Sequence, residues 1–229
     1  IIENYFTIGI FGKPNAGKST LANSIIGYER IKTSSKAGTT SDLVEDHFVF
    51  KNQKFKLLDT AGIFKKNKID INSINFEAIR KSLEIINKID LCIMLIDSNN
   101  GFDSQIKKIL NMLINQSRSV IIIFNKIDTI NEKNLFIKQT KLEVKETYSQ
   151  TKNLSIIFIS ANNKSNVDKL KSTLFAKSNR IVKKTSTGKL NACLKHSSLE
   201  KPHPLIKGKS VKFKYAVQIS TSPFTIKIF

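Results

Sequence analysis

The chain contains few cysteine and acidic residues and no long apolar run. Its 229 residues include two cysteines, four prolines, and 18 Asp or Glu against 38 Lys or Arg. Cys92 and Cys193 have neither metal-binding nor disulfide spacing, which fits a reducing compartment, and we expect both side chains to be buried. No stretch approaches the roughly 20 apolar residues of a membrane helix, and no secretory leader is visible. We therefore expect a cytoplasmic protein that does not bind a membrane.

The length allows one domain of about 150–180 residues and a smaller second piece. Hydrophobic residues make up 40% of the chain, which suits a packed core. The chain starts almost directly in an apolar strand and ends within the apolar run 224–229. We therefore expect a fragment of a longer protein, cut at both ends.

The most informative segment is GKPNAGKST, at residues 12–20. Gly12 and Gly17 bracket four residues before a Lys-Ser pair, between an apolar strand and an amphipathic helix, and this is the pattern of a phosphate-binding loop. Backbone N–H groups and the helix N-terminus would hold the phosphates. Lys18 would reach the β- and γ-phosphates, and the Ser19 hydroxyl would bind Mg²⁺. The candidate phosphate-binding residues are Gly12, Asn15, Ala16, Gly17, Lys18, Ser19 and Thr20.

The base of the nucleotide is indicated by NKID, at residues 125–128 after a second apolar strand. The Asp128 carboxylate can pair with both the N1–H and the exocyclic amine of guanine, a pair of donors that adenine lacks. Asn125 can bond the base N7 and tie this loop to the phosphate loop, while the Lys126 stem can lie along the base and ribose. A Ser-Ala pair follows a later strand, and the N–H of Ala161 can bond guanine O6. The candidate base-binding residues are Asn125, Lys126, Asp128, Ser160 and Ala161.

Two shorter segments complete the predicted site. Asp59 ends an apolar strand and can hold Mg²⁺ through water, and the N–H of the following Gly62 can meet the γ-phosphate. In the segment GTTSD, either Thr39 or Thr40 can complete the Mg²⁺ shell. The order and spacing of these segments along the chain support one shared site.

Strands and helices alternate along the chain, which favours parallel strands in one sheet. Apolar segments predict strands at 5–11, 44–50, 55–58, 91–96, 120–124 and 155–159. Helical spacing of apolar residues predicts helices at 21–26, 74–89, 103–115, 132–148 and 166–181. Further on, TGKLN at 187–191 leads into a predicted short helix, and 212–220 alternates as a strand.

The positive charge is concentrated toward the C-terminus. Residues 164–229 contain fifteen Lys or Arg and two acidic residues, a balance of +13, so the preceding 163 residues carry only +7 of the total of +20. Codon bias is an alternative explanation, because the whole chain is rich in Lys, Asn and Ile, but bias alone would spread evenly. The contrast therefore predicts that this region contacts a nucleic acid.

Together the five segments GKPNAGKST, GTTSD, DTAGI, NKID and SA resemble the translation-factor-related GTPases, in the subgroup that includes the Era, tRNA-modification GTPase and Der families. The tail, with TGKLN and then KYAVQ, resembles the KH-like domain that follows the second GTPase domain of the Der (EngA) family. This resemblance covers nearly the entire chain. It implies a doubly wound α/β P-loop GTPase domain at 1–182 and part of an α+β KH-like domain at 183–229.

The resemblance to the Der family implies a bacterial ribosome-assembly factor with tandem GTPase domains. Such a protein binds and hydrolyses GTP and acts on the large ribosomal subunit and its rRNA, with GTP or GDP and Mg²⁺ as cofactors. The N-terminal GTPase domain of the same chain is then a missing partner. The implied metal ligands are Ser19, Thr40 and Asp59, and the implied catalytic residues are Lys18, Asn15, Thr39, Thr40 and Gly62.

A potassium ion is also implied. The chain has Ile63 where Ras-like enzymes place a water-orienting Gln, so another group must assist hydrolysis. Resemblance to potassium-stimulated GTPases implies that Asn15 helps to hold K⁺ beside the phosphates, with the Thr39 region closing over it. The alternative is that Asn15 only shapes the turn.

Two other functions stay open. The first is a GTP-controlled interaction module with negligible turnover. The second is a tRNA-modification GTPase, although the helical flanks and terminal catalytic Cys of that family have no counterpart here. No GxxG loop is visible in the tail, so no residue is predicted to grip RNA in the manner of a KH module.

Overall fold

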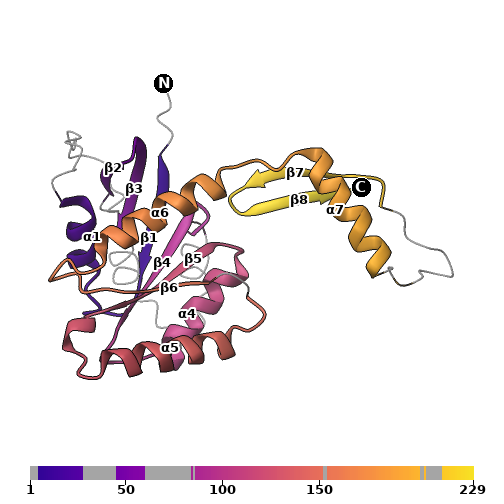
Figure 1. Ribbon diagram of the computed structural model, residues 1–229. Coiled ribbons are helices and arrows are strands. Elements are labelled where there is room, and N and C mark those ends of the chain that lie inside the picture. The colour runs from indigo at the N-terminus through magenta and orange to yellow at the C-terminus, as the bar shows by residue number, and fades with distance from the viewer. Residues whose placement is uncertain are drawn as a thin grey trace. The chain divides into compact units, whose positions relative to one another are not determined.

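The computed structural model describes residues 5–27, 45–59, 84, 86–151, 154–201, 204 and 213–229. The chain divides into two compact units, Ile1–Ala176 and Lys177–Phe229. The first unit is built around a mixed β-sheet, and the second contains a helix and a β-hairpin (Figure 1).

The described residues of the first unit form a sheet of six strands, in the order β2-β3-β1-β4-β5-β6. Their bounds are β1 Phe6–Phe11, β2 Glu45–Phe50, β3 Gln53–Asp59, β4 Leu91–Asp97, β5 Ser119–Asn125 and β6 Ser155–Phe158. The pairs β1–β3, β1–β4, β4–β5 and β5–β6 are parallel, and only the β2–β3 hairpin is antiparallel. The strand order reverses beside β1, as in a doubly wound α/β fold, which confirms the predicted fold class.

Helices cover both faces of this sheet. Figure 1 shows α1 and α6 on one side and α4 and α5 on the other. Their bounds are α1 Lys18–Ile26, α4 Ser104–Asn115, α5 Lys133–Thr147 and α6 Val167–Ile181. The predicted helix 74–89 lies mostly outside the described residues. Within the part of the chain that is described, no helix is long and apolar enough to cross a bilayer.

The centre of the core is formed by β4 and β5. All seven residues of β4 and six of the seven in β5 are buried. Because side chains alternate along a strand, Met94 of β4 and Ile122 of β5 pack into the same cluster as Ile106 of α4. Burial raises the pKa of the Cys92 thiol in β4 to about 12, so this cysteine is an unreactive core residue, as expected.

The second unit begins with the end of α6 and contains α7 (Thr187–Glu200), β7 (Ala216–Thr221) and β8 (Phe224–Ile228). The side chain of Ser186 caps α7 by accepting a hydrogen bond from the Lys189 N–H at 3.4 Å. The helix therefore begins with the TGKLN segment, where the sequence predicts a helix. The predicted strand 212–220 begins later than expected, at Ala216.

Side-chain hydrogen bonds join α7, and the residues just before it, to the hairpin of the second unit. The Asn191 Oδ1 accepts from the Ala216 N–H at 2.7 Å, and the Gln218 Oε1 accepts from the Thr185 N–H at 2.8 Å. The helix buries none of its side chains, so the expectation that Cys193 is buried was wrong. Apolar residues of α7 do not repeat at a helical spacing that would form one continuous buried face.

Candidate nucleotide-binding site

The phosphate loop connects β1 to α1 at the carboxyl end of β1. Two glycines make its path possible. A Cβ on Gly12 would lie 2.3 Å from the carbonyl oxygen of Leu95 in β4, and a Cβ on Gly17 would lie 2.5 Å from Nδ2 of Asn125. Gly17 also has a φ of 93°, a left-handed conformation that favours glycine. Gly12 is therefore required by the close approach of the β4 backbone, and Gly17 by its left-handed conformation and the nearby Asn125 side chain.

Lys18 folds back over this loop. Its Nζ donates to the carbonyl oxygens of Gly12 at 2.9 Å and Lys13 at 2.7 Å. Ser19 and Thr20 follow it in the first turn of α1 and are both exposed. The first turn of α1 contains no acidic residue, so the partial positive charge of the helix N-terminus is not neutralised there. The loop thus has the charge and donors that suit a phosphate group.

Two other residues of the loop are Asn15 and Ala16. Asn15 is exposed and has a φ of 64°, a left-handed conformation that Asn tolerates better than most residues. Ala16 is buried, and its carbonyl oxygen faces the base loop. The conformation of Asn15 agrees with a role in shaping the turn and leaves its potassium role a prediction.

Asn125 joins three loops. It ends β5 and is only 2% exposed. Its Nδ2 donates to the Ala16 carbonyl oxygen at 2.9 Å, and its Oδ1 accepts from the Ala161 N–H at 2.9 Å. Its carbonyl oxygen accepts from the Ser98 Oγ at 2.6 Å. The predicted tie between the base loop and the phosphate loop is therefore a direct side-chain hydrogen bond.

The rest of the base loop turns away from β5. Lys126 has a φ of 62°, and the short 3-10 helix Ile127–Thr129 follows it. The Lys126 Nζ lies 2.7 Å from Oδ2 of Asp97, the last residue of β4. Asp128 is exposed at the rim of the loop, where its carboxylate is accessible to a base.

The Ser-Ala pair lies directly after β6. Ser160 is buried and pairs with Ser165 in an isolated bridge, while its Oγ accepts from the Asn163 N–H at 3.3 Å. The Ala161 N–H, predicted to bond guanine O6, donates to Asn125 instead, so a bond to O6 requires that N–H to be shared. The Ser24 Oγ of α1 donates to the Ala161 carbonyl oxygen at 2.6 Å, which ties this loop to the helix after the phosphate loop.

Three of the predicted site residues are not described by the structure. Thr39, Thr40 and Gly62 are not among the described residues. The backbone of Asp59 is described: it ends β3 and pairs with Ile10 of β1, next to the start of the phosphate loop. Within the described ranges, no group of three or more His, Cys, Asp or Glu could hold a metal ion.

Two acidic residues at the site were missed by the sequence-based prediction. Asp97 holds Lys126, and Asp103 forms an ion pair with Lys13. Asp103 also caps α4, a role that an Asp before an amphipathic helix does signal. Their lysine partners are distant in sequence, so no local pattern could have predicted the pairing.

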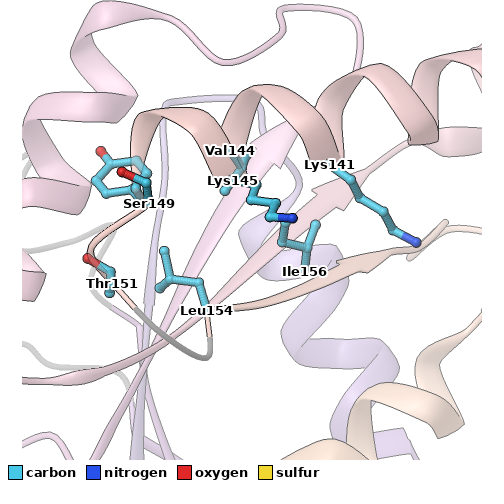
Figure 2. A pocket seen from close by; sticks show the side chains of 8 residues that line it. Lys141, Val144, Lys145, Ser149, Thr151, Leu154 and Ile156 are labelled. Atoms are coloured by element: carbon cyan, nitrogen blue, oxygen red, sulfur yellow. The ribbon is translucent and has the colours of Figure 1, made fainter.

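A pocket lies elsewhere, between the second half of α5 and the start of β6 (Figure 2). Its volume is about 640 Å³, and Val144, Leu154 and Ile156 form an apolar part of its lining. Lys141 and Lys145 add positive charge. Since it lies at the amino end of β6, the pocket is separate from the loops that follow the carboxyl ends of the strands.

The fold and these loops define a P-loop nucleotide-binding protein. Residues 7–126 match the family described as 50S ribosome-binding GTPase, and residues 184–229 match the KH-domain-like family of EngA bacterial GTPase enzymes, C-terminal. The first match covers more than half of the chain, so the chain belongs to this family of GTPases. The predicted combination of a GTPase domain and a KH-like domain is thereby confirmed.

Curated relatives extend this likeness over nearly the whole chain. GTPase Der of Persephonella marina is 37% identical over 97% of this chain and 49% of its own length. GTPase Der of Sulfurihydrogenibium sp. strain YO3AOP1 is 34% identical over 99% of this chain and 50% of its own length. These matches confirm the resemblance to the Der family, and the chain spans about half the length of these relatives.

Solved structures agree on the fold. Era from Aquifex aeolicus, as a variant bound to GDP and AlF4⁻, has a TM-score of 0.56 and 28% identity over 73% of this chain and 55% of that chain. Era in complex with MgGDPNP and a 16S rRNA segment has a TM-score of 0.57 and 28% identity over 74% of this chain and 55% of that chain. Elongation factor SelB from Methanococcus maripaludis, with a TM-score of 0.58 and 24% identity over 77% of this chain and 34% of that chain, supports the fold alone.

Proposed function

We propose that this chain binds GTP and GDP with Mg²⁺ and hydrolyses GTP as part of a ribosome-assembly factor. The main observation that supports this proposal is the position of Asn125. One buried amide bonds both the phosphate loop and the Ser-Ala loop, so phosphate and base determinants are held as one unit. Such a preorganised site reduces the ordering that a nucleotide must impose when it binds.

The proposed site residues follow from this arrangement. The phosphates are bound by Gly12, Asn15, Ala16, Gly17, Lys18, Ser19 and Thr20. The base is bound by Asn125, Lys126, Asp128, Ser160 and Ala161. Asp128 supplies the specificity, because a site built to bond guanine donors rejects a base that lacks them.

A Mg²⁺ ion fits the available donors. It would be held by Ser19, Thr40 and Asp59, with phosphate and water oxygens completing its shell. Ser19 is exposed at the start of α1, and Asp59 ends the strand paired with β1, so both hard-oxygen donors belong to elements that flank the phosphate loop. When bound, Mg²⁺ would neutralise charge on the β- and γ-phosphates.

Hydrolysis is proposed to depend on positioning and charge. Lys18 reaches the β- and γ-phosphates, and the Gly62 N–H meets the γ-phosphate. Asn15, with the region of Thr39 and Thr40, helps to hold a K⁺ ion where other enzymes use an arginine finger. The exposed position of Asn15 beside the phosphate-binding residues supports this role.

The proposed partner is the large ribosomal subunit and its rRNA. The C-terminal balance of +13 and the Era complex with an rRNA segment support RNA contact. We place the domain boundary at residues 182 and 183, because α6 ends at Ile181 and the KH-like match begins at 184. A preceding GTPase domain is part of this proposal, since the curated relatives are about twice as long as this chain. A cytoplasmic location is proposed with it.

The test is nucleotide binding and turnover on the purified chain. A fluorescent GDP analogue with Mg²⁺ should be displaced by GTP and GDP but not by ATP. GTP turnover should be slow alone and faster with ribosomal particles. Tight GTP binding with no turnover in either condition would favour the interaction-module alternative, and displacement by ATP as readily as by GTP would contradict the proposal.

A further inference from the structure

Two carboxylates lie at the two ends of the connection between β4 and α4. Asp97 is the last residue of β4, and Asp103 is the N-cap of α4. Each forms an ion pair with a lysine from a different loop of the proposed nucleotide site. Asp97 pairs with Lys126 of the base loop, and Asp103 pairs with Lys13 of the phosphate loop.

Asp97 is held from several directions. Its side chain is largely buried, at 9% residue exposure. Its Oδ1 accepts from both the backbone N–H and the Nδ2 of Asn99, each at 3.0 Å, and its Oδ2 contacts Lys126 at 2.7 Å. Asn99 in turn donates to the Thr129 Oγ1 at 2.9 Å. The carboxylate therefore presents Oδ2 to Lys126 in a fixed orientation.

Lys126 is held on its backbone side as well. The Thr129 Oγ1 donates to the Lys126 carbonyl oxygen at 2.7 Å, which supports its left-handed backbone conformation. A lysine side chain has many rotamers in solution, so an ion pair that restricts them reduces the ordering needed on binding. Asp97 thus determines where the Lys126 stem lies.

Asp103 acts on the phosphate loop in a similar way. Its Oδ1 accepts from the Ile106 N–H at 3.0 Å, and its Oδ2 holds the Nζ of Lys13. The Lys13 carbonyl oxygen is one of the two acceptors for the Lys18 Nζ. Asp103 is therefore linked to the proposed phosphate-binding Lys18 through one residue, Lys13.

Both carboxylates are ionised at neutral pH. Burial alone would raise the pKa of Asp97, but the hydrogen bonds from Lys126 and Asn99 outweigh it, so the pKa lies below its ordinary value. Burial also acts to raise the pKa of Asp103, and the bonds from Lys13 and the start of α4 lower it further than burial raises it.

We propose that Asp97 and Asp103 are positioning residues of the nucleotide site, which hold Lys126 against the base and Lys13 in the phosphate loop. This assignment rests on the proposed guanine-nucleotide function. It goes beyond the loop motifs, since neither residue belongs to one. The β4–α4 connection then orients both the base loop and the phosphate loop.

The test compares amide variants in the full chain. Asp97→Asn and Asp103→Asn keep the size of the side chain, and Asn remains a good N-cap for α4. Glu143→Gln is the matched control, because it removes an exposed Lys–carboxylate pair with Lys107 at 3.2 Å, away from the proposed site. Dissociation constants for GDP and GTP, steady-state kinetics and melting temperatures are measured for each variant.

Asp97→Asn should weaken GDP and GTP equally, by about tenfold, and raise KM more than it lowers kcat. Asp103→Asn should weaken GTP more than GDP, because it acts through the phosphate loop. In a Lys13→Gln background, Asp103→Asn should cause no further loss of nucleotide affinity. A purely structural role of Asp103 would instead cause the same loss in both backgrounds. If Asp97→Asn fails to fold, Asn99→Ala should give a smaller loss in the same direction.

The outcomes separate this inference from the proposed function. Unchanged affinities in Asp97→Asn and Asp103→Asn, beside normal wild-type binding, would overturn the positioning roles alone. Equal losses in Glu143→Gln would also overturn them. A wild-type chain that binds no guanine nucleotide would overturn the proposed function, and the assignment with it.

Discussion

The two units of this chain differ in how much they bury. In the first unit, β4 is buried along its whole length and β5 along nearly all of it. In the second unit, α7 buries no side chain and large apolar residues of the hairpin are exposed, including Ile219 at 62% and Phe224 at 56%. The first unit is a packed scaffold, whereas the described part of the second unit buries few side chains, and Asn191 joins its helix to its hairpin by hydrogen bonds.

The kind of binding follows the same division. Recognition of a nucleotide base requires donors and acceptors placed to within fractions of an ångström, and the first unit holds its loops by buried side chains such as Asn125. Attraction to a phosphate backbone depends on charge and tolerates looser structure. The proposed function of the first unit therefore depends on geometry, and that of the second unit depends on charge.

The largest effect is expected from removal of the phosphate-loop lysine. Lys18→Ala should reduce GTP turnover by about 10²–10³-fold, because the variant loses a charge aimed at the transferred phosphoryl group. The melting temperature should change little, since Lys18 is not a core residue. Lys133→Ala, an exposed position on α5, is the control for loss of a lysine. Turnover in Lys18→Ala close to wild type would contradict the assignment.

The next effect sharpens the contrast in packing. Ile122→Ala in β5 should lower the free energy of unfolding of the first unit by about 2–5 kcal/mol, because the loss of a fully buried side chain leaves a cavity. Ile219→Ala in β7 should change the free energy of unfolding of the second unit by less than about 0.5 kcal/mol, since that side chain is mostly exposed. Urea denaturation followed by circular dichroism gives both values. Equal losses would show that the second unit is packed as tightly as the first.

The sequence predicted the first unit much better than the second. Strands such as 91–96 and 120–124 were predicted to within one or two residues, because continuous burial leaves an unmistakable apolar run. The strand predicted from 212 begins at Ala216, and Cys193 is exposed, because a thinly packed unit imposes little apolar periodicity. Apolar patterns in a sequence reflect which side chains are buried, so they predict secondary structure poorly in a unit that buries few side chains.

The same limit applies within the site. Motif spacing predicted the phosphate loop and the NKID loop, since each is a local backbone structure with required residue types. Asp97 and Asp103 were missed because their lysine partners are 29 and 90 residues away in sequence. The parallel pairing of β1, β4 and β5 places the loops that carry these residues at the same edge of the sheet.

A smaller effect is expected for the charges of the second unit. If this unit binds RNA electrostatically, its affinity for RNA should fall steeply with salt. A plot of the logarithm of the association constant against the logarithm of the salt concentration should have a slope of about −0.7 for each phosphate contacted on a single strand. Changing the exposed Lys183 and Lys184 to Gln should reduce the size of that slope by up to about 1.4. The matched control changes Lys133 and Lys138 of α5 to Gln. Binding that is insensitive to salt would contradict an electrostatic contact.

The smallest effect concerns Asn15. GTP turnover should be faster in potassium than in sodium at equal ionic strength, and Asn15→Ala should remove the difference. The left-handed backbone at this position means that Asn15→Ala also adds some strain, so Asn15→Gly is the control for the turn. Stimulation that survives in both variants would remove Asn15 from cation binding and leave it a turn residue.

If the loops of the first unit form a guanine-nucleotide site, Asp128 determines which base they select. Asp128→Asn leaves the base donors without their carboxylate acceptor, a loss on the order of 1–3 kcal/mol or more. An amide offers one donor and one acceptor, so the variant should prefer xanthosine nucleotides. Glu132→Gln, an exposed acid with no capping hydrogen bond, is the matched control.

The measurement is competition between GTP and XTP for the wild type, Asp128→Asn and Glu132→Gln. If these loops form a guanine-nucleotide site, the wild type and Glu132→Gln select GTP and Asp128→Asn selects XTP. A preference for GTP that persists unchanged in Asp128→Asn would contradict the assignment of the base-binding loop.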